Sequence, residues 1–482
     1  MKPPIFNLLM KYVSKQRIRF SSPGHKGKIR MRTDNLLSLD VEKVPYSDGN
    51  EHLEDAIKAS ETEIAGIFSA SKSYYLSGGT ACGVYAALSA VCAPGDKVIV
   101  DPECDKTIIN AITILALQAV FIKRSYSERY SINGGINTER IEKAISKCPN
   151  AKMIILTSPT YYGVCSNIKK ASIIAHENNM LLMVDESYGA HFTFSKHSPD
   201  TALECGADIV VHSLSKTLGG FKGSALLHIA ETIESRLSST IEAILDIYEG
   251  ERASSAMLCA SENILFYAFK NADKYDVIFK ELERGRKIIN SRTDLLWFGV
   301  ENGTGCDINQ TDETKIVLNF SGVDMSAYEA SVLLMNKYGI ECDYADKENI
   351  VFSVSLYNTA SEIRKLVNSI LTLSRMMKSS GKTDDETNMP ELFDEGPNAV
   401  MSSYKAFHSG GDWVEPEAAI GKICRKAISK MPQGTPVIIP GEKITKEQID
   451  MIKELKGMDV TLHGLGSDGK IEVLSLSDSF YF

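Results

Sequence analysis

A lysine and an aspartate stand where an α/β protein binds its ligand. Asp185 ends the apolar run LLMVD (181–185), and Lys216 closely follows the next apolar run, DIVVHS (208–213). If both runs are parallel strands, both side chains reach the crevice at the carboxyl ends of the strands. A buried lysine there can form a Schiff base, and desolvation should lower its pKa toward the reactive neutral amine. A neighbouring carboxylate can hold a pyridine nitrogen protonated, which makes a bound ring an electron sink.

Each of these two residues also has a structural interpretation. Lys216 by itself fits an exposed surface lysine, and Asp185 by itself fits a helix N-cap. The spacing of the pair, together with Ser213 three residues before the lysine, favours the chemical interpretation. We therefore take Lys216 and Asp185 as the candidate catalytic residues.

The segment SGGTACG (77–83) is a glycine-rich turn that leads directly into a stretch of helical period. The first N–H groups of a helix can bind a phosphate, helped by the helix dipole. The motif is weak by itself, because it also fits a tight strand-to-helix turn. Its place well ahead of Asp185 fits a phosphate site, to which the Ser213 hydroxyl adds a donor. The candidate ligands in the segment are Gly79, Thr80, Ala81 and Cys82.

The elements that must position these residues alternate in type between residues 70 and 230. Short, continuously apolar runs are separated by stretches of helical period, such as TACGVYAALSAV (80–91). Runs of this kind indicate a mostly parallel sheet that is covered by helices on both faces. The expected strands are 97–101, 119–124, 152–159, 181–187, 208–213 and 224–229.

The rest of the chain predicts further units. Residues 231–290 are helical in pattern, and residues 314–375 mix strands and helices in the manner of a small α+β domain. Residues 379–398 are polar, acidic and poor in apolar side chains, which is typical of a linker. The expected organisation is an N-terminal segment (1–60), a large domain (61–290), a small domain (291–378), a linker (379–398) and a C-terminal domain (399–482).

Bulk properties exclude several classes of function. The formal net charge of −9 argues against a nucleic-acid surface, and no apolar run is long enough to cross a membrane. The 10 cysteines include no C-x-x-C pair, so no metal site is expected. The N-terminal residues 1–20 have charges among their apolar residues, which favours an amphipathic helix over a signal peptide. We therefore expect a cytoplasmic protein.

Seven segments in order resemble the pyridoxal 5'-phosphate (PLP)-dependent Orn/Lys/Arg decarboxylases, in the short form of Gram-positive bacteria. The resemblance covers nearly the whole chain and implies a PLP-dependent transferase fold of type I (aspartate-aminotransferase-like). It also implies a small α+β domain and a C-terminal decarboxylase-type domain. The segments are SSPGHKG (21–27), SGGTACG (77–83), APGDKVIVDPECDKT (93–107), LTSPTYYGV (156–164), VDESYGAHF (184–192), GADIVVHSLSKTL (206–218) and PQGTPVIIPGEKIT (432–445).

The resemblance implies a role for each matching residue. Lys216 matches the lysine that carries PLP as an imine, and Asp185 matches the partner of the pyridinium nitrogen. Ser213 and Thr80 match ligands of the phosphate. Ser255 matches a serine that reaches the phosphate of the neighbouring subunit, which implies a homodimer or a higher homo-oligomer.

The chain departs from the family near the reaction centre. Asp105 stands where the family has a histidine stacked on the cofactor ring. The family's DEAHG is DESYG here, which places Ser187 against the ring and Tyr188 where a histidine is usual. Ser215 replaces the histidine before the lysine, and Ala256 replaces an aromatic residue. Three imidazoles are therefore missing, and Asp105 adds negative charge near the cofactor.

The interpretation we favour is the decarboxylation of a basic amino acid (lysine, ornithine or arginine) through a Lys216 Schiff base. Such an enzyme would make a polyamine-type product. The missing histidines keep an alternative open, in which the chain is a PLP-dependent aminotransferase or catalyses another Cα/Cβ transformation. A non-catalytic family member is a further alternative, against which the joint retention of Asp185, Ser213 and Lys216 argues.

Four other residues fit either a structural or a functional role. His25 and Lys26 lie in a Pro-Gly turn and favour a structural role. His191, after the strand that ends at Asp185, fits a packed core histidine as well as a ligand. Glu251 and Arg252 could bind the charged ends of a substrate or form a solvated salt pair.

Overall fold

The computed structural model describes residue 8 and residues 11–28, 36–41, 53–250, 254–299, 306–380, 399–457 and 460–475. Residues 1–7 and 9–10 of the expected N-terminal helix, most of the expected linker (379–398), and the residues Glu251 and Arg252 lie outside these ranges. Of the described residues in 1–20, residues 8 and 11–13 are helical, but Ile18–Arg19 form the strand β1, so a helix over the whole segment is wrong. Within them, no helix has the length and apolar character to cross a membrane.

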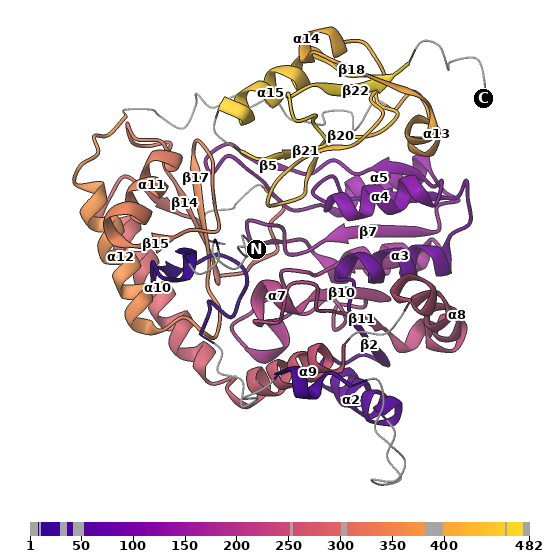
Figure 1. The fold of residues 1–482 in the computed structure, drawn as a ribbon, viewed down its shortest axis with the longest axis horizontal. Coiled ribbons are helices and arrows are strands. Elements are labelled where there is room, and N and C mark those ends of the chain that lie inside the picture. The colour runs from indigo at the N-terminus through magenta and orange to yellow at the C-terminus, as the bar shows by residue number, and fades with distance from the viewer. Residues whose placement is uncertain are drawn as a thin grey trace, which may run out of the picture.

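A seven-stranded sheet, in the order β2-β11-β10-β9-β7-β3-β4, forms the centre of the chain (Figure 1). The six expected strands are all present, and β2 (KSYYL) is an additional edge strand. β11 runs in the opposite direction to the other six strands, which are all parallel to one another. This confirms the predicted mostly parallel sheet. The strands are β2 Lys72–Leu76, β3 Lys97–Val100, β4 Gln118–Phe121, β7 Met153–Thr157, β9 Leu181–Asp185, β10 Ile209–Ser213 and β11 Ala225–Ile229.

Helices cover both faces of this sheet (Figure 1) because its strands are apolar on both sides. The alternation along β10 shows this, since Val211 packs with one hydrophobic cluster and Val210 with the other. The Val211 cluster includes side chains of α3 (Thr80–Val91), α4 (Lys106–Ile114) and α8 (Glu231–Glu249). The Val210 cluster includes side chains of α2 (Leu53–Ile67), α5 (Thr138–Lys147), α6 (Ile168–Glu177), α9 (Ser255–Lys270) and α10 (Lys274–Arg292).

A second sheet, β12-β14-β17-β16, follows α10 in the chain. Its strands are β12 Leu296–Trp297, β14 Lys315–Asn319, β16 Tyr344–Ala345 and β17 Asn349–Ser353. The helices α11 (Ala327–Tyr338) and α12 (Ala360–Ser374) each begin with a capping box, Ser326 with Glu329 and Thr359 with Glu362. The strands and helices expected in 314–375 are confirmed, whereas the domain boundaries stay a prediction.

The C-terminal residues form two small sheets, at the top of Figure 1. One pairs β18 (Gly411–Val414) with β22 (Ile471–Leu474), and the other has the order β20-β19-β21. Their remaining elements are α13 Ser403–His408, α14 Pro416–Ala419, β19 Ile428–Lys430, β20 Pro436–Ile438, α15 Lys446–Gly457 and β21 Leu462–His463. The loop between β19 and β20 turns back toward α4, where the N–H of Lys106 donates to the carbonyl of Gly434 at 2.8 Å.

A buried ion pair joins the ends of two central strands. Asp101 directly follows β3, and its carboxylate accepts two hydrogen bonds from Arg124, at 2.7 Å from Nε and 2.5 Å from Nη2. Both side chains are almost fully buried. Arg124 also donates to the carbonyl of Thr157 at 2.9 Å, and the N–H of Thr157 donates to Asp101 at 3.0 Å. The pair therefore fixes the carboxyl ends of β3 and β7 against each other.

Removal of one partner from this pair should destabilise the chain strongly. Arg124→Met leaves the Asp101 carboxylate buried without its counter-charge, and we expect a loss of about 3–5 kcal/mol of unfolding free energy. The measurement is the urea concentration at the midpoint of unfolding. As a control, Lys287→Met removes an exposed i,i+4 pair with Glu283 and should leave the midpoint close to that of the wild type. Equal midpoint shifts in the two variants would contradict the assignment.

Candidate functional site

The two candidate catalytic residues meet at one edge of the central sheet. Lys216 lies in the short helix α7 (Leu214–Thr217), directly after β10. Strands β9 and β10 are parallel, and Asp185 pairs with Val211. Both strands therefore end at the same edge, and the charges of Asp185 and Lys216 influence each other's pKa. The structure brings together the two residues that the sequence predicted to share a crevice.

Lys216 lies against the ring of Tyr188, with its Nζ 3.8 Å from the ring centroid. Burial alone would lower the lysine's pKa, but the negative potential of Tyr188, Asp105 and Asp185 outweighs burial and raises the pKa above its ordinary value. The expectation of a lowered pKa is therefore wrong for this chain. The physical reason is that two carboxylates share the crevice with the amine. At neutral pH the side chain is an ammonium, which is a proton donor.

Asp185 is buried at the end of β9 and is held by the next turn of the chain. Its Oδ1 accepts hydrogen bonds from the N–H of Ser187, at 3.0 Å, and from the Ser187 hydroxyl. Burial raises the pKa of Asp185, while Lys216 and the Ser187 hydrogen bonds oppose that rise. Ser187, predicted to lie against a cofactor ring, thus orients the carboxylate in this structure.

Helix α3 begins at the same edge without a side-chain cap. Its N-cap is Gly79, whose φ of 74° favours glycine, and no side chain accepts a hydrogen bond from the first turn. A Cβ on Gly78 would collide with the Sγ of Cys82, so the approach to the helix is closely packed. Leu76 of β2 and Ser213 of β10 both pair with Ala225, so this helix end and Ser213 lie one strand apart. The N–H of Cys82 donates to the carbonyl of Gly79 at 3.2 Å. A helix start without a side-chain cap is suited to an anion.

The Ser213 hydroxyl is paired with that of Ser215, at 3.1 Å. The predicted phosphate ligands Thr80, Ala81 and Cys82 form the first turn of α3. All of these residues come from segments that end or begin at the carboxyl edge of the sheet. The arrangement concentrates hydroxyl and N–H donors on the β2 side of Lys216.

Asp105 is the N-cap of α4. Its Oδ1 accepts the N–H of Thr107 at 2.8 Å, so part of the carboxylate has a structural partner. A Cβ on Gly434 would collide with this carboxylate, which shows how closely the β19–β20 loop covers it. Asp105 nevertheless raises the pKa of both Lys216 and Asp185. It therefore acts on the site through its charge, and the sequence pattern gave no signal that the C-terminal loop would cover it.

Ser255 begins α9 and forms its hydrogen bonds with residues 39 and 41 of the same chain. Its hydroxyl donates to the carbonyl of Leu39 at 2.6 Å and accepts the N–H of Val41 at 2.8 Å. Among the described residues, no hydrogen bond joins Ser255 to Lys216 or Asp185. Its predicted contact with a neighbouring subunit stays a prediction.

A second buried lysine, Lys315, lies near Tyr188, and the sequence patterns did not indicate it. Lys315, the first residue of β14, has its Nζ 4.5 Å from the ring centroid of Tyr188 and 4.7 Å from that of Tyr161. It donates to the Ser353 hydroxyl at 2.6 Å and lies 3.4 Å from Asp343. Burial lowers the pKa of Lys315, although Asp343 opposes this. A lysine that opens an apolar strand is usually exposed, so the sequence gave little sign of this role.

The PGHKG segment packs directly on the lysine loop. The N–H of Gly24 donates to the carbonyl of Ser215 at 2.8 Å, and a Cβ on Gly24 would come within 2.9 Å of the Thr217 carbonyl. Lys26 is buried beside it and donates to the carbonyls of Ser21 and Ser353, each at 2.8 Å. The structural interpretation of Lys26 is confirmed.

His191 is also a packed residue. It is 1% exposed, and its Nε2 lies 3.3 Å from Asp312 and 3.1 Å from the hydroxyl of Thr314. These partners hold the Nε2 side of the ring, whereas its Nδ1 is buried without a hydrogen-bond partner among the described residues. The packing interpretation of His191 therefore stays a prediction.

The chain is similar to known proteins in sequence and in fold. Residues 3–355 match the family described as Orn/Lys/Arg decarboxylase, major domain. The arginine decarboxylase of Halalkalibacterium halodurans is 27% identical over 483 residues, which cover 96% of this chain and 96% of the relative. That of Bacillus subtilis is 26% identical over 468 residues, or 95% and 94% of the two chains. The solved constitutive lysine decarboxylase of E. coli has a TM-score of 0.70 at 18% identity, over 98% of this chain and 82% of that chain. The predicted fold class, type I, is confirmed.

The charge environment of Lys216 predicts its reactivity. Asp185→Asn removes a carboxylate that raises the lysine's pKa, so more neutral amine is present at pH 8. Labelling by trinitrobenzenesulfonate should become faster, by about tenfold for each unit of pKa. Peptide mass spectrometry of the PLP-free chain measures this rate at Lys216, with the exposed Lys287 of the same sample as reference. Slower labelling of Lys216 in the variant would contradict the assigned environment.

Lys26 predicts a pH dependence of stability. Burial lowers its pKa from 10.5 to about 7. Between these values the unfolded chain binds the proton more readily, so stability should rise with pH from about 7 to 10.5. Lys26→Met should reduce this rise, as measured by urea unfolding midpoints across the range. Lys28→Met, at the partly exposed neighbour, serves as the control. A rise that is the same in wild type and Lys26→Met would refute the prediction.

Proposed function

The chain belongs to the Orn/Lys/Arg decarboxylase family, and on this premise we propose that it decarboxylates a basic amino acid with PLP held on Lys216. The proposed substrate is lysine, ornithine or arginine, and the product is a polyamine-type amine. The observation that carries the proposal is the meeting of Lys216 and Asp185 at the carboxyl edge of the parallel sheet, beside the uncapped start of α3.

The residues at this edge fit PLP in three respects. The start of α3 has N–H groups without a side-chain cap, which suits the phosphate, and Ser213 adds a hydroxyl nearby. Lys216 supplies the amine for an imine. Asp185 is a buried carboxylate whose pKa is raised by burial, and a pyridinium would give it the opposite charge that it needs. The remaining predicted ligands, Gly79, Thr80, Ala81, Cys82, Asp105, Ser187 and Ser255, are part of this proposal.

When bound, PLP would supply an electron sink for the electron pair that stays on Cα when carbon dioxide leaves. The residues of the chain do the rest. Asp185, oriented by Ser187, holds the proton on the ring nitrogen. Lys216 returns a proton to Cα after carbon dioxide leaves, and the carboxylates that keep it protonated favour this acid role. Tyr188 covers the amine, and the β19–β20 loop covers Asp105 beside it.

The names of the relatives indicate a class of substrate, the basic amino acids, but they do not agree on one amino acid. Two of them are named arginine decarboxylases, and the similar solved structure is a lysine decarboxylase. We further propose a cytoplasmic homodimer or higher homo-oligomer, in which Ser255 contacts the neighbouring subunit's phosphate. The hydrogen bonds that Ser255 makes to residues 39 and 41 would have to yield to that contact.

A second candidate function is an aminotransferase or another Cα/Cβ reaction on the same cofactor. The groups that set the charge around Lys216 are a phenol and two carboxylates, and none of the described ones is an imidazole. The second candidate would use the same binding site but break the Cα–H bond in place of the bond to the carboxylate.

The experiment is an absorbance spectrum with PLP, before and after lysine, ornithine or arginine is added, with released carbon dioxide trapped. We expect an imine band and carbon dioxide from one substrate. Lys216→Ala should lose the band and lower turnover by at least about 100-fold, whereas Lys287→Ala should retain both. A band that responds to amino acids and yields a keto acid without carbon dioxide would select the second candidate. The absence of any band would refute PLP binding.

A further inference from the structure

Four buried polar side chains form a chain of hydrogen bonds across the central sheet, away from Lys216. Glu186 directly follows β9, His212 lies on β10, His228 on β11 and Ser73 on the edge strand β2. Their exposed fractions are 2%, 1%, 0% and 3%. The links are 2.7 Å from Glu186 Oε2 to His212 Nε2, 3.0 Å from His212 Nδ1 to His228 Nε2, and 2.7 Å from His228 Nδ1 to Ser73 Oγ.

The strand register explains why these residues meet. His228 pairs with Ser73 across β11 and β2, and with Val210 across β11 and β10. His212 is two residues from Val210, so its side chain projects from the same face as His228. Phe68 covers both imidazoles, with ring centroids 5.0 Å and 4.7 Å away. The chain therefore runs perpendicular to the strands and is sealed by an apolar ring.

The hydrogen-bonding capacity of the groups fixes the direction of the chain. The Glu186 carboxylate accepts the N–H of Ala202 at 3.0 Å and the Nε2–H of His212. The Nδ1 of a neutral His212 then accepts from the Nε2–H of His228, whose own Nδ1 accepts from the Ser73 hydroxyl. Burial and the neighbouring His212 lower the pKa of His228 well below its ordinary value, which keeps that ring neutral. Each donor thus points toward Glu186.

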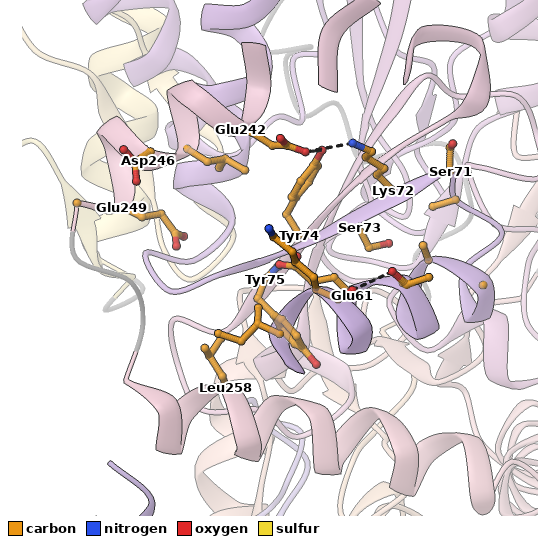
Figure 2. A pocket seen from close by; sticks show the side chains of 18 residues that line it. Glu61, Ser71, Lys72, Ser73, Tyr74, Tyr75, Glu242, Asp246, Glu249 and Leu258 are labelled. Carbon is orange, nitrogen blue, oxygen red and sulfur yellow. Dashed lines mark hydrogen bonds and ion pairs between the residues drawn. The ribbon is translucent and has the colours of Figure 1, made fainter. Parts of the chain in front are cut away.

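The two ends of the chain lie in different surroundings. Ser73 is in the wall of a cavity of about 700 Å³ between α2, β2 and α8, where Figure 2 shows it beside Lys72 and Tyr74. Glu186 lies behind the turn that carries Ser187 and Tyr188, and its carbonyl accepts the N–H of Gly189 at 2.8 Å. The other titratable groups that act on Glu186 or feel its charge are His191, Cys165 and Cys205.

We propose that Ser73, His228, His212 and Glu186 form a proton relay between this cavity and the turn behind the active site, and that Glu186 and His212 are positioning residues for that turn. In one transfer, the Ser73 proton moves to His228 Nδ1, the His228 Nε2 proton to His212 Nδ1, and the His212 Nε2 proton to Glu186. Ser73 regains a proton from an acidic water in the cavity. The net result is one proton moved from the cavity to Glu186, with both imidazoles neutral again.

The relay does not depend on the proposed function, whereas its effect on the active site does. In its first state Glu186 is a carboxylate that accepts from His212, and in the second it is a carboxylic acid that donates to His212. The hydrogen bond persists in both states, but the charge behind Ser187 and Tyr188 differs. A proton that arrives from the β2 edge of the sheet therefore changes the electrostatic potential at the turn that orients Asp185.

The relay is tested by nuclear magnetic resonance of the full chain with ¹⁵N-labelled histidine and added PLP. His212 and His228, assigned with His212→Gln and His228→Gln, should both be neutral Nε2–H tautomers at pH 7. Ser73→Val, which differs from Ser73→Thr by a methyl group in place of the hydroxyl, should slow exchange of the ring N–H protons with solvent by about tenfold or more. Ser73→Thr retains the hydroxyl and should keep the wild-type rate. An imidazolium at His212, an Nε2–H tautomer at one ring with an Nδ1–H tautomer at the other, or equal exchange in the Val and Thr variants would overturn the relay.

The positioning role has its own readout in the pH midpoint of the PLP absorbance band. His212→Leu removes the donor to Glu186 and should shift the midpoint. His212→Gln keeps an N–H donor and should have the midpoint of the wild type. His176→Gln, at a partly exposed histidine paired with Asp208, is the matched control. No shift in His212→Leu would overturn the positioning role. If the wild type shows no band at all, the proposed function fails, and the resonance experiment still decides on the relay.

Discussion

The attraction between the Lys216 ammonium and the carboxylates around it is the interaction on which the site depends. Burial by itself disfavours the charge on Lys216 and on Asp185, and each of them is tolerated because the other lies at the same sheet edge. The geometry follows from parallel β9 and β10, whose carboxyl ends coincide. A crevice with these charges also suits a ligand that brings an anionic group and a ring cation of its own.

The rest of the molecule keeps this crevice in shape. The Asp101–Arg124 pair ties the ends of β3 and β7, and α3 starts at the β2 end. Segments far away in the chain close the remaining sides. The N-terminal PGHKG turn packs on the lysine loop, Lys315 of β14 lies on Tyr188, and the β19–β20 loop covers Asp105. The site is therefore a product of the whole fold, although its reactive residues come from one sheet.

The departures from the family acquire physical meaning in this setting. Tyr188 takes a place where the family has histidine, and it lies between two buried lysines, Lys216 and Lys315. Burial raises its pKa to about 12, while Lys216 opposes that rise. Two histidines of this sheet, His212 and His228, belong to the chain of hydrogen bonds that ends at Glu186.

The sequence by itself determined the type of fold and the place of the candidate pair, Asp185 and Lys216. Apolar strands such as 181–185 and 208–213, separated by helices, leave few arrangements other than a covered parallel sheet, whose carboxyl edge must then receive Asp185 and Lys216. The same reasoning located the helix start after Gly79. This reasoning did not predict the edge strand β2, because KSYYL is short and mixes polar with aromatic residues.

Only the tertiary structure decided the charge state of Lys216 and the partners of Asp105, Lys26 and Lys315. A pKa depends on every charge within several ångströms, and the carboxylates that raise the pKa of Lys216 are far from it in sequence. The same holds for the relay, whose members join only when β2, β11, β10 and β9 are aligned in register. The pattern of apolar residues along a strand indicates which of its faces is buried, but it does not indicate which strand lies beside it.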